Sequence, residues 1–225
     1  MRTALAIAAI VAASGSAHAV ITNGFVETFA TGTGGFGSGG GLGGTVTSQA
    51  PAGNNPDPSF GGANNGFLEV DSTGSAGAQL ATRAINQPQY TGSYRDAGVS
   101  TISFWLIDTD ELDDAVIRVG IGRQNANFWV SNRSWDVDEF WQRFEVDLVQ
   151  EQWTQIIDNG NWTDNFEDAV SNANVLQFRA DAAIGSRGPD AIAGSFGVDN
   201  IAFIPAPGFG GLAAVGLLAA ARRRR

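Results

Sequence analysis

Short apolar segments recur along the middle of the chain, and polar or Gly-rich turns separate them. Ile102, Phe104 and Leu106 alternate with other side chains, so they share one face of an extended segment. The same period of two recurs over 143–148, where apolar residues oppose charged ones. A period of two predicts β-strands with one buried face.

Ten segments of this kind are expected to be strands. They lie at 24–30, 66–71, 77–84, 99–107, 115–122, 126–131, 141–148, 152–157, 174–182 and 195–204. Only 163–171 offers a helical turn or two. Many short strands with few helices predict an all-β sandwich or barrel of about ten strands.

Residues 1–19 have the pattern of a secretory signal peptide. Arg2 gives a positive start, an apolar run covers 4–13, and residues 17–19 (Ala-His-Ala) form a small-x-small cleavage site. The run is shorter than the roughly 20 residues that span a bilayer. We expect cleavage after Ala19 and export of the remaining chain.

The C-terminus combines two prolines, an apolar run and a basic cluster. Pro205 and Pro207 precede an apolar run at 209–221. The last residues are Arg222, Arg223, Arg224 and Arg225. An apolar run followed by cations is typical of a stop-transfer segment, and a run this short and rich in Gly and Ala is a weak permanent anchor. A terminal helix with a basic tail is the alternative.

This C-terminal arrangement resembles the PEP-CTERM sorting signal over about the last 22 residues, with Ala206 where the prototype has Glu. The resemblance implies export, transient anchoring in the inner membrane by a hydrophobic transmembrane helix, and processing by an exosortase-type enzyme. It implies a place at the bacterial cell surface or in an extracellular exopolysaccharide matrix. The expected organisation is therefore a signal peptide at 1–19, one domain at 20–204 and a sorting tail at 205–225.

Residues 32–44 contain nine Gly, and we interpret them as a flexible loop inside the domain. Too few residues precede this stretch for it to separate two domains.

The segment between the two ends is strongly acidic and lacks several residue types that catalysis uses. Residues 20–206 hold eight Arg and 23 acidic residues, a net charge of −15. This charge disfavours nucleic acid and anionic membrane surfaces as partners. The absence of His, Lys, Cys and Met from this segment excludes a Ser-His-Asp triad, a Schiff-base Lys and thiolate- or imidazole-bound zinc. Carboxylate chemistry and oxygen-ligated calcium remain.

Four segments follow an order similar to jelly-roll β-sandwiches of the carbohydrate-binding-module and laminin-B types. They are GFLEVDSTG at 66–74, QYTGSYRDAGVSTISFWL at 89–106, WQRFEVDL at 141–148 and GSFGVDNIAFI at 194–204. The resemblance spans most of 24–204. It implies a jelly-roll sandwich in which the first and last strands are neighbours.

The same resemblance suggests a structural calcium site. Glu27 lies in the first predicted strand and Asp199 in the last, and carboxylates at these places in such jelly rolls bind Ca²⁺ with help from carbonyl oxygens. An Arg partner or an exposed edge is the alternative for Asp199. A second acidic stretch, 108–114, has five carboxylates in seven residues, and we interpret it as the solvated tip of a hairpin.

Tryptophans near polar turns suggest a carbohydrate-binding site. An exposed Trp ring stacks on the apolar face of a sugar, and neighbouring polar groups bind the hydroxyls. We expect such a site to contain Trp129 and Trp135, with Asn132 and Arg133 beside them. The alternative for each ring is a place in the core.

Glu145, Asp147 and Glu151 invite comparison with retaining glycosidases. Glu151 follows Glu145 by six residues, roughly 20 Å along a strand, whereas a retaining pair needs its carboxyl groups about 5–5.5 Å apart. We therefore expect a polar strand face here.

The sequence favours an exported, non-catalytic module that binds a polysaccharide. A structural or adhesive matrix protein without a specific glycan site is the main alternative, and a carboxylate glycoside hydrolase or lyase is the third.

Overall fold

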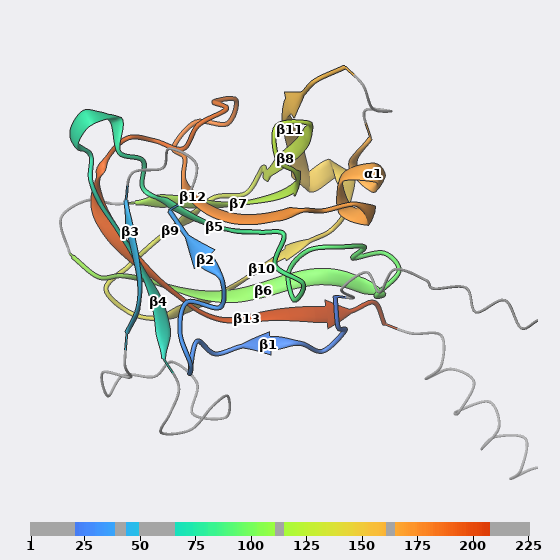
Figure 1. Cartoon of the computed structure of the whole chain (residues 1–225), viewed down its shortest axis with the longest axis horizontal. Helices are drawn as coiled ribbons and strands as arrows, with labels where there is room; N and C mark the ends of the chain where they lie inside the picture. Colours follow the sequence, from blue (N-terminus) through green and yellow to red (C-terminus); the bar gives the residue numbers. More distant parts are fainter. Residues whose placement is uncertain (1–20, 39–43, 50–65, 111–114, 161–164, 208–225) are drawn as a thin grey trace, which may run out of the picture.

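The structure is a computed structural model, and it describes residues 21–38, 44–49, 66–110, 115–160 and 165–207. Two antiparallel sheets, which we call sheets A and B, pack face to face as a sandwich (Figure 1). The expected signal peptide with its cleavage site at Ala19, and the C-terminal apolar run with its four arginines, lie outside the described residues.

Sheet A has the strand order β10-β6-β13-β4-β3, and β1 also pairs with β13. Its strands are β1 (Val26–Glu27), β3 (Thr45–Gln49), β4 (Phe67–Thr73), β6 (Val99–Asp108), β10 (Gln142–Asp147) and β13 (Ala193–Pro205). The last strand, β13, lies in the middle of this sheet. It pairs with β6 on one side and with β4 and then β1 on the other.

Sheet B has the order β11-β8-β7-β12-β5-β2, and β9 also pairs with β7. Its strands are β2 (Phe36–Gly37), β5 (Ala81–Ile85), β7 (Val116–Arg123), β8 (Asn127–Ser131), β9 (Trp135–Asp136), β11 (Trp153–Asp158) and β12 (Val175–Ala180). Two short 3₁₀ turns, η2 (Ser75–Gly77) and η3 (Gln150–Gln152), lie in connections.

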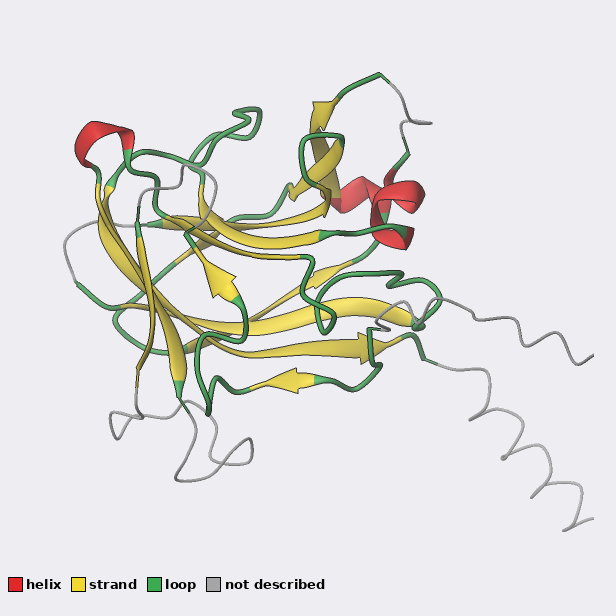
Figure 2. Ribbon diagram, in the orientation of Figure 1, coloured by secondary structure: helices red, strands yellow, loops and turns green. Residues whose placement is uncertain are grey.

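One short helix, α1 (Phe166–Ser171), lies beside β7 and β8 at one end of the sandwich (Figure 2). Its first turn is capped by Asn165, whose side chain accepts a hydrogen bond from the Asp168 amide at 2.7 Å. The helix buries Phe166, Ala169 and Val170 against the core. Within the part of the chain that the structure describes, no helix has the length and apolar character needed to cross a membrane.

The core fills the space between the sheets, and strand alternation supplies it. Ile102, Phe104 and Leu106 of β6 are fully buried, as the sequence predicts. From sheet B, Leu176 and Phe178 of β12 enter the same core. Because successive residues of a strand point to opposite faces, Gln177 and Arg179 of β12 must lie on the outer face of sheet B.

The predicted all-β architecture is confirmed, and each of the ten expected segments contains a strand. The expected helical turn is α1. Strands β2, β3 and β9 were not predicted. β2 and β9 have only two residues each, and β2 and β3 lie beside the Gly-rich stretch at 32–44. The interpretation of 32–44 as loop throughout is wrong at Phe36, which is buried in β2 and packs 4.9 Å from the Tyr90 ring.

The acidic stretch at 108–114 is also placed differently from the prediction. It joins β6 of sheet A to β7 of sheet B, so it connects the two sheets and is not the tip of a hairpin. Residues 111–114 lie outside the described residues.

Candidate functional site

A cavity of about 460 Å³ lies on the outer face of sheet B. Strands β5, β8, β11 and β12 contribute to it, together with the β7–β8 turn and the segment that leads from β12 to β13. Its lining residues are Gln79, Arg83, Gln124, Asn125, Phe128, Ile157, Val175, Gln177, Arg187, Gly188 and Pro189.

Glycine at one position of β7 makes room for an aromatic ring in this face. Gln177 of β12 pairs with Arg83 of β5 on one side and with Gly120 of β7 on the other, so the three residues form a row across the sheet. A Cβ atom on Gly120 would lie 2.3 Å from Cζ of Phe128. The Phe128 ring therefore lies across β7 in space that any other residue at 120 would fill.

The floor of the cavity is apolar at the end where Phe128 lies. Phe128, Val130 and Val175 form a small buried cluster on this face, and Ile85 and Ile157 pack against it. Arg83 and Gln177 lie one row further along the sheet. The cavity thus offers an apolar surface beside amide and guanidinium donors, which is the combination that sugar rings need.

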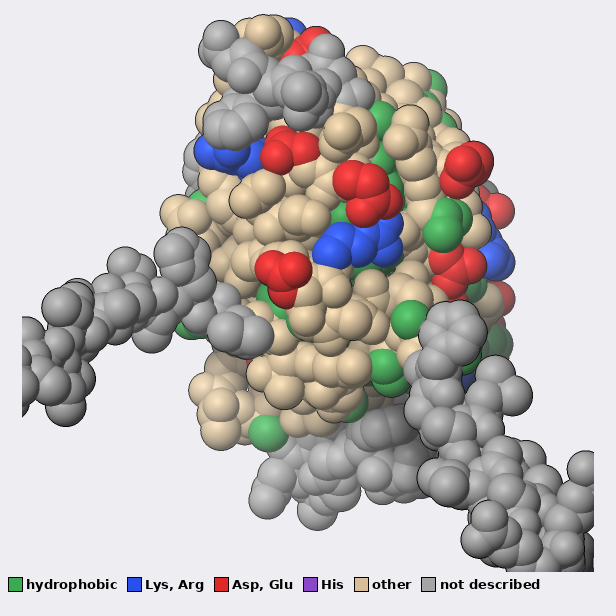
Figure 3. All heavy atoms as spheres, turned by 90° about the vertical axis from the view of Figure 1, so that its right-hand side faces the viewer, with side chains coloured by type: hydrophobic (Ala, Val, Ile, Leu, Met, Phe, Trp, Pro, Cys, Tyr) green, Lys and Arg blue, Asp and Glu red, His purple; other side chains and the backbone are tan. Residues whose placement is uncertain are grey.

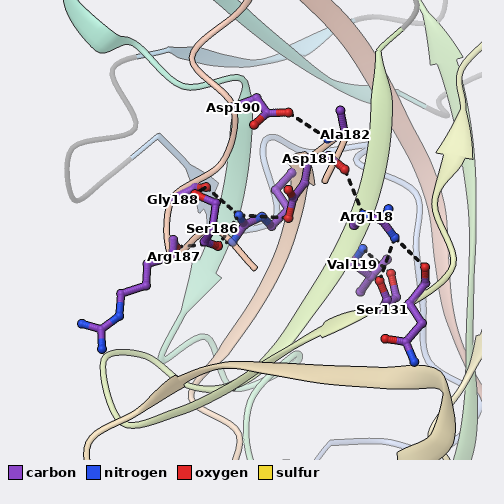
Figure 4. A network of polar contacts seen from close by, with 11 residues as sticks. Arg118, Val119, Ser131, Asp181, Ala182, Ser186, Arg187, Gly188 and Asp190 are labelled. Carbon is purple, nitrogen blue, oxygen red and sulfur yellow. Dashed lines mark hydrogen bonds and ion pairs between the residues drawn. The ribbon is translucent and has the colours of Figure 1, made fainter. Parts of the chain in front are cut away.

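One wall of the cavity is the segment 182–189, and a buried arginine holds it. Arg179, at the outer face of β12, is fully buried. Its Nη2 donates to the carbonyls of Ser186 at 3.0 Å and Gly188 at 2.7 Å, and its Nη1 donates to the carbonyl of Arg187 at 3.5 Å (Figure 4). Three successive carbonyls are therefore fixed by one side chain.

Further contacts close the base of this wall. The Ala182 amide donates to Oδ2 of Asp190 at 2.8 Å, and the Asp190 amide donates to the Ala180 carbonyl at the same distance. At its far side the wall touches Gln79, since a Cβ on Gly188 would lie 2.5 Å from Gln79 Nε2. The wall is thus held in place by contacts within the fold.

Asp181 supplies the carboxylate of this network. Its Oδ2 lies 3.1 Å from Arg179 Nη2, and both side chains are fully buried. Burial raises the pKa of Asp181, and the neighbouring Arg179 acts in the opposite direction. Burial likewise lowers the pKa of Arg179. Arg118 of β7 joins the network by donating from Nε to the Asp181 carbonyl at 2.8 Å.

The expected exposure of Trp129 and Trp135 is wrong. Trp129 is 6% exposed and packs edge-on against Phe166 of α1, with its Nε1 donating to Asn127 at 2.6 Å. Trp135 is 2% exposed and packs against Phe104 at 5.0 Å. Neither ring presents a face on which a sugar could stack, because alternation turns both toward the core.

Asn132 and Arg133 are exposed as expected, but they lie in a turn that is not part of the cavity. The Asn132 side chain donates to the Glu151 carbonyl at 2.9 Å and accepts from the Thr154 hydroxyl at 2.6 Å. The Arg133 guanidinium lies 5.8 Å from the centre of the Trp135 ring. Both side chains therefore already have contacts within the fold.

Glu27 and Asp199 lie on adjacent strands, since β1 pairs with β13 and Glu27 stands opposite Ile201. Glu27 accepts from the Phe29 amide and from the Tyr90 hydroxyl, each at 2.8 Å. Asp199 is 1% exposed and accepts from the Asn200 amide at 2.6 Å. The two residues stand near the place where β13 changes partner from β4 to β1.

Glu145 and Asp147, which were compared with the carboxylates of retaining glycosidases, each contact another side chain. Glu145 forms an ion pair with Arg143 at 2.7 Å on β10, and Asp147 accepts from Thr101 at 2.8 Å.

At the end of the sandwich that faces the viewer in Figure 3, acidic, basic and apolar side chains are interspersed. That end therefore carries no single-sign surface in the described residues of this view.

Sequence reasoning missed the cavity residues Arg83, Phe128, Gln177 and Arg187. A signal was present in β7 and β12, where buried Ile117, Val119 and Ile121 alternate with Arg118, Gly120 and Gly122, and Leu176 and Phe178 flank Gln177. Glycine and polar residues that alternate with core residues on two paired strands indicate a hollowed outer face.

Several solved structures are similar to this fold. The chain is similar to CtCBM11 in its solution structure, with a TM-score of 0.51 and 19% identity over 83% of this chain and 98% of that chain. It is similar to an exo-β-agarase with a TM-score of 0.54 and 12% identity over 83% of this chain and 25% of that chain. The CBM22-1 xylan-binding domain of Xyn10C from Paenibacillus barcinonensis matches with a TM-score of 0.47 and 13% identity over 83% of this chain and 99% of that chain.

The protein is thus a jelly-roll β-sandwich of the kind found in carbohydrate-binding modules. No protein-family model matches the chain, and no curated protein matches it either.

Proposed function

We propose that the protein is a non-catalytic carbohydrate-binding module whose ligand lies on the outer face of sheet B. The cavity beside Phe128 and Gln177 is the observation that supports this most directly, because its wall and floor are formed by fixed residues. A preformed site loses little entropy on binding, which suits a weakly held polysaccharide. The jelly-roll relatives add the expectation of sugar as ligand.

Each part of the cavity has a place in this proposal. Half-buried Ile157 would contact the apolar face of a sugar ring, and buried Phe128 and Val175 would form the packed layer beneath it. Gln177 and Arg83 would donate hydrogen bonds to its oxygens, and Asn125, exposed in the β7–β8 turn, would do the same at the rim.

Export and C-terminal processing belong to the same proposal. Ile21 is 1% exposed and packs in the core, and the Gly24 amide donates to the Phe203 carbonyl at 3.0 Å. A core residue therefore lies two positions after the expected cleavage site at Ala19. At the other end β13 runs to Pro205, and the Ala206 amide donates to Gly98 at 2.9 Å. A sorting tail would leave the domain from this point, for an exosortase-type partner at the cell surface or in the matrix.

We further propose a structural calcium beside Asp199. In the described residues, both polar side-chain atoms of Asn200 are buried without a hydrogen-bond partner, and Asn200 has a positive φ of 47° in the bulge of β13. Among the same residues no three acidic or histidine side chains gather as a metal site. Calcium would therefore be held by Asp199 and the Asn200 amide oxygen, with Glu27 and backbone carbonyls completing the oxygen ligands. It would join β1 to β13.

Affinity electrophoresis of the purified full chain through gels that contain a panel of polysaccharides tests the proposed function. We expect retardation by a subset of polymers, and we expect Gln177→Ala to weaken it by about tenfold. Trp135→Phe is the matched control, because it changes a core ring and leaves the cavity intact.

Three other results would contradict the proposal. Retardation by no polymer, with a folded protein, would favour the structural or adhesive matrix protein. Loss of retardation in Arg133→Ala with an unchanged Gln177→Ala variant would place the site at the Asn132–Arg133 turn. Release of reducing ends or unsaturated products, lost in Glu145→Gln, would indicate a hydrolase or lyase.

A further inference from the structure

The ionisable residues of the cavity have the opposite sign to the domain as a whole. Acidic residues outnumber arginines by 23 to eight in residues 20–206. The cavity nevertheless has Arg83 and Arg187 among its lining residues and, within the described part of the chain, no Asp or Glu. The described lining therefore has a positive formal charge within an acidic domain.

The charges behind the cavity balance one another and leave the sign of its lining unchanged. Arg118 and Arg179 lie on the same outer face, in the row next to Arg83. The carboxylates nearby are Asp181 and Asp190. Asp181 is buried against Arg179, and Asp190 accepts the Ala182 amide. Both carboxylates therefore serve the wall of the cavity, and neither lines it.

The buried network presents Arg187 to the ligand. Arg179 holds the carbonyl of Arg187 and the carbonyls on either side of it. The Arg187 side chain is exposed and extends away from this network (Figure 4). Its backbone is thus fixed while its side chain is exposed, and half-buried Arg83 lines the same cavity.

The cavity has little aromatic surface for a neutral sugar. Phe128 is the one aromatic residue among the described lining residues, and it is 4% exposed. The polar part of the described lining consists of Arg83, Arg187 and side-chain amides. A guanidinium matches a carboxylate or sulfate group with two parallel hydrogen bonds, and such charge-assisted bonds are stronger than those to hydroxyls.

We propose that the cavity recognises an anionic polysaccharide, and that Arg83 and Arg187 bind its carboxylate or sulfate groups. This inference rests on the proposed function of the same face. The acidic remainder of the surface does not prevent binding, because charges more than about 8 Å away are largely screened at physiological salt.

Matched polymers test the proposal with the full chain. Polygalacturonate and its methyl ester share one backbone and differ in charge, and dextran sulfate and dextran form the corresponding pair for sulfate. We expect the charged member of at least one pair to retard the protein at least about tenfold more strongly than its neutral partner. The pair that responds identifies carboxylate or sulfate as the recognised group.

The variants Arg187→Gln and Arg83→Gln should each reduce that retardation by about tenfold. Arg143→Gln is the matched control, since Arg143 is an exposed arginine on sheet A. Because Arg83 is half-buried, Arg187→Gln keeps the test decisive if Arg83→Gln fails to fold. Each mobility is compared with that of the same variant in a polymer-free gel.

The remaining outcomes separate the two proposals. Equal retardation by charged and neutral members of both pairs would overturn the anionic ligand and leave carbohydrate binding intact. A charge preference that survives both Arg variants would overturn the assignment to this cavity. Retardation by no polysaccharide at all would overturn the proposed function itself.

Discussion

Arg179 Nη2 lies 3.1 Å from Asp181 Oδ2, and neither side chain reaches solvent. The same nitrogen also donates to the Ser186 and Gly188 carbonyls, so one guanidinium joins a buried charge to the wall of the cavity. A buried pair of this kind contributes little stability by itself, because desolvation offsets the attraction. Its effect is to fix where the wall lies.

Replacement of Arg179 should therefore cost more than loss of an ion pair at the surface. Arg179→Met leaves the Asp181 carboxylate buried without its cation, and we expect the free energy of unfolding to fall by about 3–5 kcal/mol in urea denaturation. Arg179→Met/Asp181→Leu should recover much of this loss. Arg143→Met, which breaks an exposed pair, should cost less than about 1 kcal/mol. Equal losses in the two single variants would contradict this account.

Gly120 should be required for the position of the Phe128 ring. A Cβ atom at 120 would stand 2.3 Å from Phe128 Cζ, so Gly120→Ala should displace the ring at a cost of about 1–3 kcal/mol and weaken polysaccharide binding. Gly120→Ala/Phe128→Leu provides the space again, and its stability should exceed that of the single variant. Thermal unfolding measures the first effect and affinity electrophoresis the second. A Gly120→Ala protein with wild-type stability and affinity would refute the packing argument.

The two tyrosines of the chain should stay protonated until the protein unfolds. Burial raises the pKa of both above the ordinary value of 10.0, and for Tyr90 the neighbouring Glu27 carboxylate adds to the effect. Since the unfolded tyrosines lose protons above about pH 10 while the folded ones keep them, stability should be unaffected below that pH. Above it, stability should fall by about 1.4 kcal/mol per pH unit for each tyrosine.

Absorbance at 295 nm during an alkaline titration measures this behaviour, with circular dichroism recorded in parallel. Phenolate should form for both residues at once, together with the loss of β structure. Ionisation of one tyrosine in a protein that is still folded would mean that its hydroxyl is accessible.

Removal of calcium should lower the melting temperature if the proposed site exists. At saturating Ca²⁺ the expected stabilisation is a few kcal/mol, which corresponds to about 5 °C or more for a domain of this size. Chelation should reverse it, Mg²⁺ should not replace it, and Asp199→Asn should abolish the response. A melting temperature that is unchanged by a chelator would exclude a structural calcium.

The positions of the strands could be predicted from the sequence, but the residues of the site could not. Apolar alternation located β6 and β10 because a buried face imposes a period of two. The side of the sheet on which a ring lies depends on the partner strand. Phe128 and Trp129 are neighbours on β8, and tertiary pairing with Gly122 and Ile121 of β7 turns the smaller ring toward the cavity and the larger one toward the core.

The contacts of Arg179 were equally hidden from the sequence. Its partners include the backbone carbonyls of 186–188, and because every residue has a carbonyl, the sequence does not reveal these contacts. Local pattern therefore predicts the sheets, and only the three-dimensional fold identifies the wall of the site.

The central place of β13 also sets an order for folding. It is the last of the described strands, yet its inner residues Phe196 and Val198 pair with β4 and β6, which lie far earlier in the sequence. Until residues 193–205 are available, β4 has only β3 as a neighbour in sheet A, and the apolar faces of β4 and β6 remain uncovered. Sheet A is thus completed only once residues 193–205 have been synthesised and, for an exported chain, have crossed the membrane. A truncation at Ser186 should leave an aggregating chain, because the missing segment is the centre of the sheet.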